Sequence, residues 1–179
     1  SVLVQLVSQP GSNYSNGGLP SETFTRPQDN FYVNDAPVEV VWLPAAHSDG
    51  DSAVRFDRAD VVAAGAVFDQ TRFPVIDVEH GGSIQGDINA LNQLLNTLVF
   101  GHTPVLVNTG GTVVIPARGP LSDQDDLVAY RDMVATVTAR VRYYIGQGKS
   151  LKQIQTADPA QGYRSRYGSD SGSWTTDDF

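Results

Sequence analysis

Three short stretches, in which an apolar run ends in a polar turn, constrain the fold of this chain more than any other feature. They are PAAHSDGD at residues 44–51, VVAAGAVFD at 61–69 and VVIPARGP at 113–120. Runs rich in Val and bounded by Gly, Pro or Asp are typical of strands that end in turns. We therefore expect the chain to fold around a sheet, with polar residues in the turns that end its strands.

The first half of the sequence predicts a meander of strands. Apolar or alternating segments favour strands at 1–7, 31–34, 38–43, 52–56 and about 60–64. Residues 8–30 are rich in Ser, Gly, Asn and Pro and predict a long surface loop. Residues 35–37 predict the turn of a hairpin, and residues 57–58 predict a second turn.

The second half mixes helices with strands. Ser83 is a candidate N-cap for a helix whose apolar residues recur at helical spacing as far as Leu98. Ser122, with Asp125 three residues later, fits a capping box before another apolar helical pattern. The remaining predictions are a strand pair at 105–108 and 112–116, an end of the long helix near 145, a short helix at 150–156 and a weakly structured tail at 163–179.

This order of elements favours an α/β fold of the layered α+β kind, with a mixed sheet and helices packed on one face. The chain has 179 residues, of which 40% are hydrophobic and 18% charged. Such a composition is typical of a globular chain, and this length suffices for one domain with its own core. No repeat or linker interrupts the sequence, so residues 1–179 are predicted to form a single domain.

Charge and composition exclude several classes of function. The formal net charge is −8 and there is no basic stripe, which argues against nucleic acid and anionic membrane surfaces as partners. No apolar run approaches the ~20 residues of a membrane-spanning helix. The absence of cysteine excludes thiolate nucleophiles and cysteine-based zinc sites. No signal peptide is visible, and the sequence leaves the compartment open.

His47 is the candidate metal ligand of the chain, because H-S-D-G-D places an imidazole and two carboxylates together after a strand. The alternative is a turn in which the Asp side chains bind backbone amides. His80 and His102 favour structural roles, and the glycine-rich segment at 81–86 favours a tight turn into a helix over a phosphate cradle. Arg72 stands between Asp69 and Asp77 in the sequence and can form an ion pair with either.

The same stretches resemble the second half of the metallo-β-lactamase-fold hydrolases, in the cyclase-like branch. P-A-A-H-S-D-G-D is similar to the segment of that family whose His binds one zinc. G-A-V-F-D at 65–69 resembles the segment whose Asp bridges two metals, and I-P-A-R-G-P at 115–120 resembles the segment whose His binds the second metal. Residues 72–95 and 127–134 also resemble this branch. The resemblance implies half of a two-sheet sandwich, without the family's first half and its His-x-His-x-Asp-His motif.

Two departures from the family pattern decide the expected chemistry. Ala66 stands where the bridging Asp is expected, and a methyl group cannot bind a cation. Arg118 stands where the second-metal His is expected, and its permanent charge repels a divalent ion. A hydrolytic zinc needs about three protein ligands. The resemblance therefore implies a degenerate metal site, with no catalytic residues and no cofactor, in a non-catalytic protein that acts by binding or assembly.

Two further interpretations stay open. In one, the chain is a fragment or a partner-dependent half of a zinc hydrolase, His47 binds a single zinc ion, and Arg118 binds an anionic group of the substrate. In the other, half a sandwich leaves one face of its sheet uncovered, which predicts a homo-oligomer or association with the complementing first half. The sequence identifies no small-molecule ligand.

Overall fold

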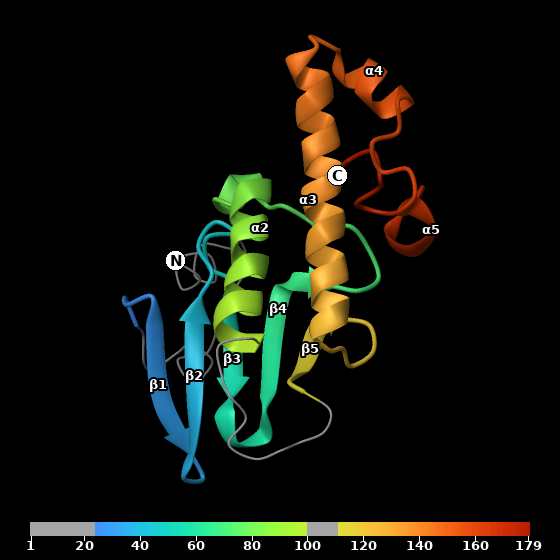
Figure 1. Cartoon of the computed structure of the whole chain (residues 1–179). Helices are drawn as coiled ribbons and strands as arrows, with labels where there is room; N and C mark the ends of the chain where they lie inside the picture. The colour runs from blue at the N-terminus through green and yellow to red at the C-terminus, as the bar shows by residue number, and fades with distance from the viewer. Residues whose placement is uncertain (1–23, 100–110) are drawn as a thin grey trace.

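A computed structural model describes residues 24–99 and 111–179, and these residues form a single mixed sheet of five strands with helices on one face (Figure 1). The strands lie in chain order: β1 (Gln28–Val33), β2 (Ala36–Trp42), β3 (Ser52–Phe56), β4 (Val61–Asp69) and β5 (Val113–Arg118). The first four are antiparallel neighbours, and β5 pairs with β4 in parallel. This arrangement confirms the predicted fold class. The predictions for 1–7 and 105–108 lie outside the described residues.

The turns differ from the predicted ones in two places. The β1–β2 hairpin is confirmed, but its turn is Asn34-Asp35, both at positive φ (51° and 60°), so β2 already begins at Ala36. Asn and Asp tolerate this left-handed conformation, which the tight turns of hairpins require. β4 continues to Asp69, past the predicted end near residue 64. Gly65 adopts φ 60° and absorbs a register shift there, so the strand can go on.

Helix α2 (Ile84–Gln93) follows Ser83, as predicted, and continues into the π-helix η4 (Leu94–Val99). The Ser83 side chain accepts a hydrogen bond of 2.9 Å from the Gly86 backbone N–H, which confirms the predicted cap.

The predicted capping box of the long helix is wrong. Helix α3 (Gln124–Gly146) is capped by Asp123, whose carboxylate accepts from the Asp126 N–H at 3.0 Å. Ser122 is occupied elsewhere, because its backbone pairs with Val114 and its hydroxyl accepts from the Gln70 amide at 2.5 Å. A tertiary contact therefore moves the cap by one residue.

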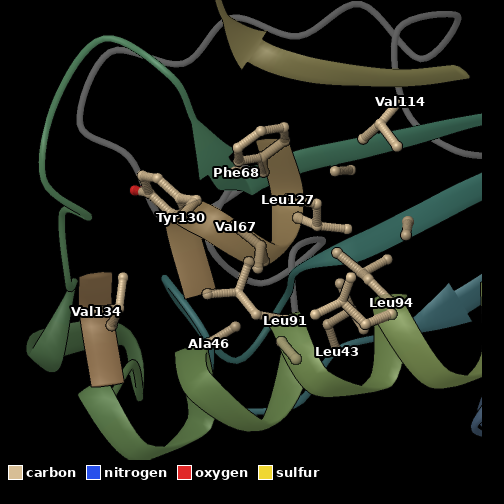
Figure 2. Close-up of a cluster of buried hydrophobic side chains, with 14 of the residues drawn as sticks. Leu43, Ala46, Val67, Phe68, Leu91, Leu94, Val114, Leu127, Tyr130 and Val134 are labelled. Atoms are coloured by element: carbon tan, nitrogen blue, oxygen red, sulfur yellow. The ribbon is translucent and has the colours of Figure 1, made fainter. Parts of the chain in front are cut away.

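The core lies between the sheet and the pair of helices α2 and α3. Figure 2 shows side chains from β4, such as Phe68, together with Leu91 of α2 and Leu127 of α3 in one buried cluster. Phe68 and Tyr130 meet edge to face, with ring centroids 5.2 Å apart. The helices thus hold one face of the sheet, and with it the ends of the strands that carry the candidate site.

The other face of the sheet, here called the outer face, is mostly apolar, with Asp29 of β1 as a charged residue in one of its rows. The pairing register places two rows of residues there: Phe31, Val38, Phe56, Val61 and Val113 in one, and Asp29, Val40, Val54, Ala63 and Ile115 in the other. Several large side chains of this face are exposed to solvent, including Phe31 (45%), Phe56 (40%) and Ile115 (38%). An exposed apolar patch of this kind is typical of an interface.

The C-terminal residues belong to the folded domain. After α4 (Leu151–Thr156), the stretch predicted to be weakly structured contains one short helix, α5 (Arg164–Tyr167), and otherwise turns. Its aromatic side chains nevertheless pack on the core: Tyr167 is buried, and Phe179 stacks on Phe73 with ring centroids 4.7 Å apart. Buried aromatic side chains therefore hold these C-terminal residues against the core, although the segment has little regular secondary structure. Among the described helices, none has the length and apolarity needed to cross a bilayer.

Candidate functional site

His47 lies in the turn after β2, and that turn is held by its own carboxylate. The Ser48 N–H donates to Asp51 Oδ2 at 2.5 Å, and the Leu43 N–H donates to the Asp51 carbonyl at 2.8 Å. Asp51 therefore has the predicted turn role. Asp49 contributes its backbone instead, since its N–H donates to the His80 carbonyl at 3.0 Å. Residues 47–51 therefore form a hydrogen-bonded turn and not a cluster of carboxylates available to a metal.

The imidazole of His47 is oriented by one hydrogen bond. Its Nδ1 donates to the Val75 carbonyl at 2.6 Å, and the side chain is half-buried. This leaves Nε2 as the ring atom with a free lone pair, which is the arrangement common among metal-binding histidines. His47 is therefore suited to donate one ligand atom.

Of the two other histidines, His80 has a structural contact. His80 Nδ1 is 2.6 Å from Asp77 Oδ2; the His80 side chain is 50% exposed and the Asp77 side chain 34%. This contact closes the short helical turn η3 (Val78–His80), whose N-cap is Asp77. His102 lies outside the described residues.

The glycine-rich segment at 81–86 serves close packing, in agreement with the tight-turn interpretation. A Cβ on Gly82 would stand 2.0 Å from the His47 carbonyl oxygen, and one on Gly86 would stand 1.8 Å from that of Ala45. Ser83 adds a backbone hydrogen bond of 2.9 Å to the Ala45 carbonyl. The start of α2 is thus pressed against the turn that carries His47, with no room for a phosphate.

Topology gathers the three predicted site positions at one edge of the sheet. β2 and β4 are both antiparallel to β3, and β5 is parallel to β4, so β2, β4 and β5 all run in the same direction. Their carboxyl ends therefore share an edge. His47 follows β2, Ala66 lies exposed near the end of β4, and Arg118 ends β5.

The residues at this edge do not fit a two-metal centre. Within residues 24–99 and 111–179, no group of three or more His, Cys, Asp or Glu side chains is arranged to hold a metal ion. Ala66 has no donor atom. Arg118 adds a cation, whose Nη1 lies 3.8 Å from Asp69 Oδ2. Of the three predicted ligand positions, only His47 presents an atom that can bind a metal.

Asp69 anchors a cluster that the sequence predicted only in part. Its carboxylate is buried, with 6% of the side chain exposed, and Oδ1 accepts from the Thr71 N–H and hydroxyl at 2.9 and 2.6 Å. Oδ2 accepts from Arg72 Nε at 2.9 Å. Arg72 therefore pairs with Asp69, one of its two predicted partners, and Asp77 pairs with His80 instead. Arg118 joins the same oxygen from the neighbouring strand.

Asp87, in the first turns of α2, is a buried carboxyl that the sequence analysis missed. It is fully buried, and neither carboxyl oxygen has a hydrogen-bond partner among the described residues. Burial raises its pKa from 3.8 to about 8, and the charge of Asp51 raises it further in the same direction. The group is therefore protonated in the folded chain at neutral pH. Position 87 shares the helix face of Ile84, Leu91 and Leu94, and a polar residue on that apolar stripe is the signal that could have found it.

Comparison with known proteins gives a fold and no closer relationship. No family model matches the sequence, and no curated protein matches it. Similar solved structures include a stereoselective inverting sec-alkylsulfatase from Pseudomonas sp. (TM-score 0.57, 13% identity, 78% of this chain and 22% of that one). A double mutant of a sec-alkylsulfatase is similar over the same shares (TM-score 0.60, 13% identity, 78% and 22%). A metallo-β-lactamase from Pontibacter korlensis also matches (TM-score 0.51, 17% identity, 66% and 50%).

These similarities show that the chain has part of the metallo-β-lactamase fold. It spans 22% of the length of the alkylsulfatases and 50% of the length of the lactamase. The fold therefore agrees with the family that the sequence resembles.

Proposed function

Because this chain carries part of the metallo-β-lactamase fold, we propose that it acts by binding and assembly rather than by hydrolysis. The observation that carries this proposal is the pair of replacements at the shared strand edge. Ala66 offers no ligand atom, and Arg118 directs a guanidinium at Asp69, within 3.8 Å. A hydrolytic zinc needs about three protein ligands and an open position for water. The described residues supply one of these, His47.

A zinc titration by calorimetry tests the loss of the metal site. We expect no binding tighter than weak micromolar, because one imidazole beside a guanidinium holds a divalent ion poorly. Substitution His47→Gln serves as the control and should leave the titration unchanged. A stoichiometric nanomolar site in the unmodified chain, lost in His47→Gln, would contradict the proposal.

The second candidate function is that of a partner-dependent half of a zinc hydrolase, and the orientation of His47 favours it. With Nδ1 bound to the Val75 carbonyl at 2.6 Å, Nε2 can complete a zinc site whose other ligands come from outside the described residues. Repeating the titration with the complementing first half present separates the two candidates, since a tight site that appears only with that half and is lost in His47→Gln supports this one.

For the assembly role, the outer face of the sheet is the proposed interface. Its two cross-strand rows are almost entirely apolar, and Phe31, Phe56 and Ile115 are exposed by 38–45%. Removing such side chains from water contributes about 25 cal/mol per Å² of apolar surface. We propose a second copy of the chain as the occupant, because two identical apolar faces can cover each other in a symmetric dimer.

Substitution Phe56→Ser is expected to weaken this dimer. It places a polar hydroxyl in the middle of the outer face without touching the core under α2 and α3. Light scattering after size-exclusion chromatography should give the mass of a dimer for the unmodified chain and of a monomer for the variant, with unchanged circular dichroism. Leu151→Ser is the matched control, because Leu151 is an exposed apolar residue (71%) at the start of α4, and it should stay dimeric. A monomeric unmodified chain would contradict the assembly role.

A further inference from the structure

The buried carboxylate of Asp69 holds two guanidinium groups at one point of the sheet edge. Arg72 Nε donates to Oδ2 at 2.9 Å, and Arg118 Nη1 lies 3.8 Å from the same oxygen. Oδ1 is already occupied by the Thr71 N–H and hydroxyl. One negative charge therefore stands against two positive charges. In the part of the chain that the structure describes, neither arginine reaches a second carboxylate.

Both arginines keep donors that no described residue uses. Arg72 binds Asp69 through Nε, its two Nη groups have no partner among the described residues, and 35% of its side chain is exposed. The Arg118 side chain makes no hydrogen bond within the described residues, and 59% of it is exposed. Free donors of two guanidinium groups around one point are the geometry that binds oxyanions, often in pairs of parallel hydrogen bonds.

The backbone that carries these arginines is fixed on both sides. The Gln70 N–H donates to the Arg118 carbonyl at 3.1 Å, and the Gln70 amide donates to Ser122 at 2.5 Å, which ties the two strand ends together. Arg72 is fixed from behind, since its carbonyl accepts from the Tyr130 hydroxyl at 3.4 Å. Hydrogen bonds therefore hold the backbone that carries the two guanidinium groups.

We propose that Arg72 and Arg118 form a binding site for a small oxyanion, such as a carboxylate, phosphate or sulfate group. The site lies at the carboxyl ends of the parallel strands β4 and β5, where open sheets commonly bind ligands. This inference rests on the proposed loss of the metal site. It adds that the ligand bound at this edge of the sheet is an oxyanion. Asp69 is its positioning residue, because it aims Arg72 and leaves the Nη groups for the ligand.

Inorganic phosphate is the probe, and thermal unfolding at constant ionic strength is the measurement. Replacing chloride by phosphate should raise the Tm of the unmodified chain in a saturable way, since a ligand that binds only the folded state stabilises it. Arg118→Gln should weaken the apparent affinity by about tenfold or more, because charge-assisted bonds are lost. This variant is expected to fold, since the Arg118 side chain is exposed and makes no hydrogen bond with the described residues. Sulfate and acetate, tested in the same way, rank the oxyanions.

Two variants distinguish specific phosphate binding at Arg72 and Arg118 from a nonspecific effect of phosphate on the charges of the protein. Arg72→Lys keeps the positive charge but loses the planar fork, and it should also weaken phosphate binding. Arg58→Gln removes an exposed arginine from the short helical turn η2 (Asp57–Ala59) and should leave the phosphate response unchanged. The inference is overturned if phosphate gives no saturable shift, or if Arg58→Gln reduces the shift as much as Arg118→Gln does. A zinc response in parallel samples would overturn the proposed metal-site loss instead, so the two failures are distinguishable.

Discussion

Substitution Asp87→Asn should make the folded chain more stable at pH 9 and remove most of its loss of stability between pH 4 and pH 8. Asp87 is fully buried, both of its carboxyl oxygens are unpartnered among the described residues, and burial raises its pKa from 3.8 to about 8. Asparagine resembles the protonated acid in size and cannot ionise. The variant therefore keeps the neutral form at every pH.

The direction of the effect follows from proton binding. Between pH 4 and pH 8 the folded chain keeps the Asp87 proton that the unfolded chain has released, so raising the pH favours the unfolded chain. Below pH 4 both states are protonated, and this contribution to stability is fully present. Above pH 8 it has been lost. A pKa raised from 3.8 to about 8 corresponds to a change of about 6 kcal/mol in the free energy of unfolding.

Urea unfolding at pH 5, 7 and 9 measures this effect. The unmodified chain should lose stability steeply over this range, and Asp87→Asn should lose much less. Asp132→Asn is the control, because 59% of the Asp132 side chain is exposed on α3, and it should follow the unmodified chain. Parallel curves for Asp87→Asn and the unmodified chain would show that Asp87 does not carry the pH dependence.

Substitution Gly86→Ala should unfold the chain or destabilise it by more than about 4 kcal/mol. A Cβ at this position would stand 1.8 Å from the Ala45 carbonyl oxygen and 2.4 Å from its carbon, and both belong to rigid backbone. The helix would have to move away from the turn that carries His47. That movement would break the hydrogen bond of 2.9 Å from the Ser83 N–H to the Ala45 carbonyl.

The control for this prediction is Gly146→Ala, in the last turn of α3. Nothing lies within 4 Å of a Cβ built there, so the change only replaces a poor helix former with a good one. It should be neutral or stabilise by up to about 1 kcal/mol. Thermal unfolding followed by circular dichroism compares the two variants. A Gly86→Ala variant as stable as Gly146→Ala would show that α2 does not pack on the turn as described.

Local sequence patterns predicted those features that depend only on hydrogen bonds between residues close together in the sequence. Ser83 caps α2 because its hydroxyl satisfies an N–H of its own helix, and that requires nothing from the rest of the chain. The cap of α3 failed for the opposite reason. Ser122 is a residue type that caps helices, but its backbone pairs with Val114 of β5 and its hydroxyl binds Gln70, which is 52 residues away in the sequence. Propensity could not reveal that competition.

In the candidate site, too, the positions of residues could be predicted from the sequence, but contacts between strands could not. The resemblance singled out His47, Ala66 and Arg118, and the order of the strands and their direction bring these positions to a common edge of the sheet. The role of Asp69 as a shared counterion for Arg72 and Arg118 depends on the register between β4 and β5. No local pattern encodes that register, since the two strands are separated by α2 and the segments around it.

The parallel pairing of β4 and β5 sets an order for folding. β1 to β4 are joined by short turns, so their antiparallel pairs can form early and at low entropic cost. β5 is parallel to β4, so the chain between them, which contains α2, must cross the sheet before the two strands can pair. Asp69 and Arg118 stand on opposite sides of that crossover. We therefore expect the contact between Asp69 and Arg118 to form late, whereas the pair of Asp69 with Arg72, three residues apart, can form as soon as β4 does.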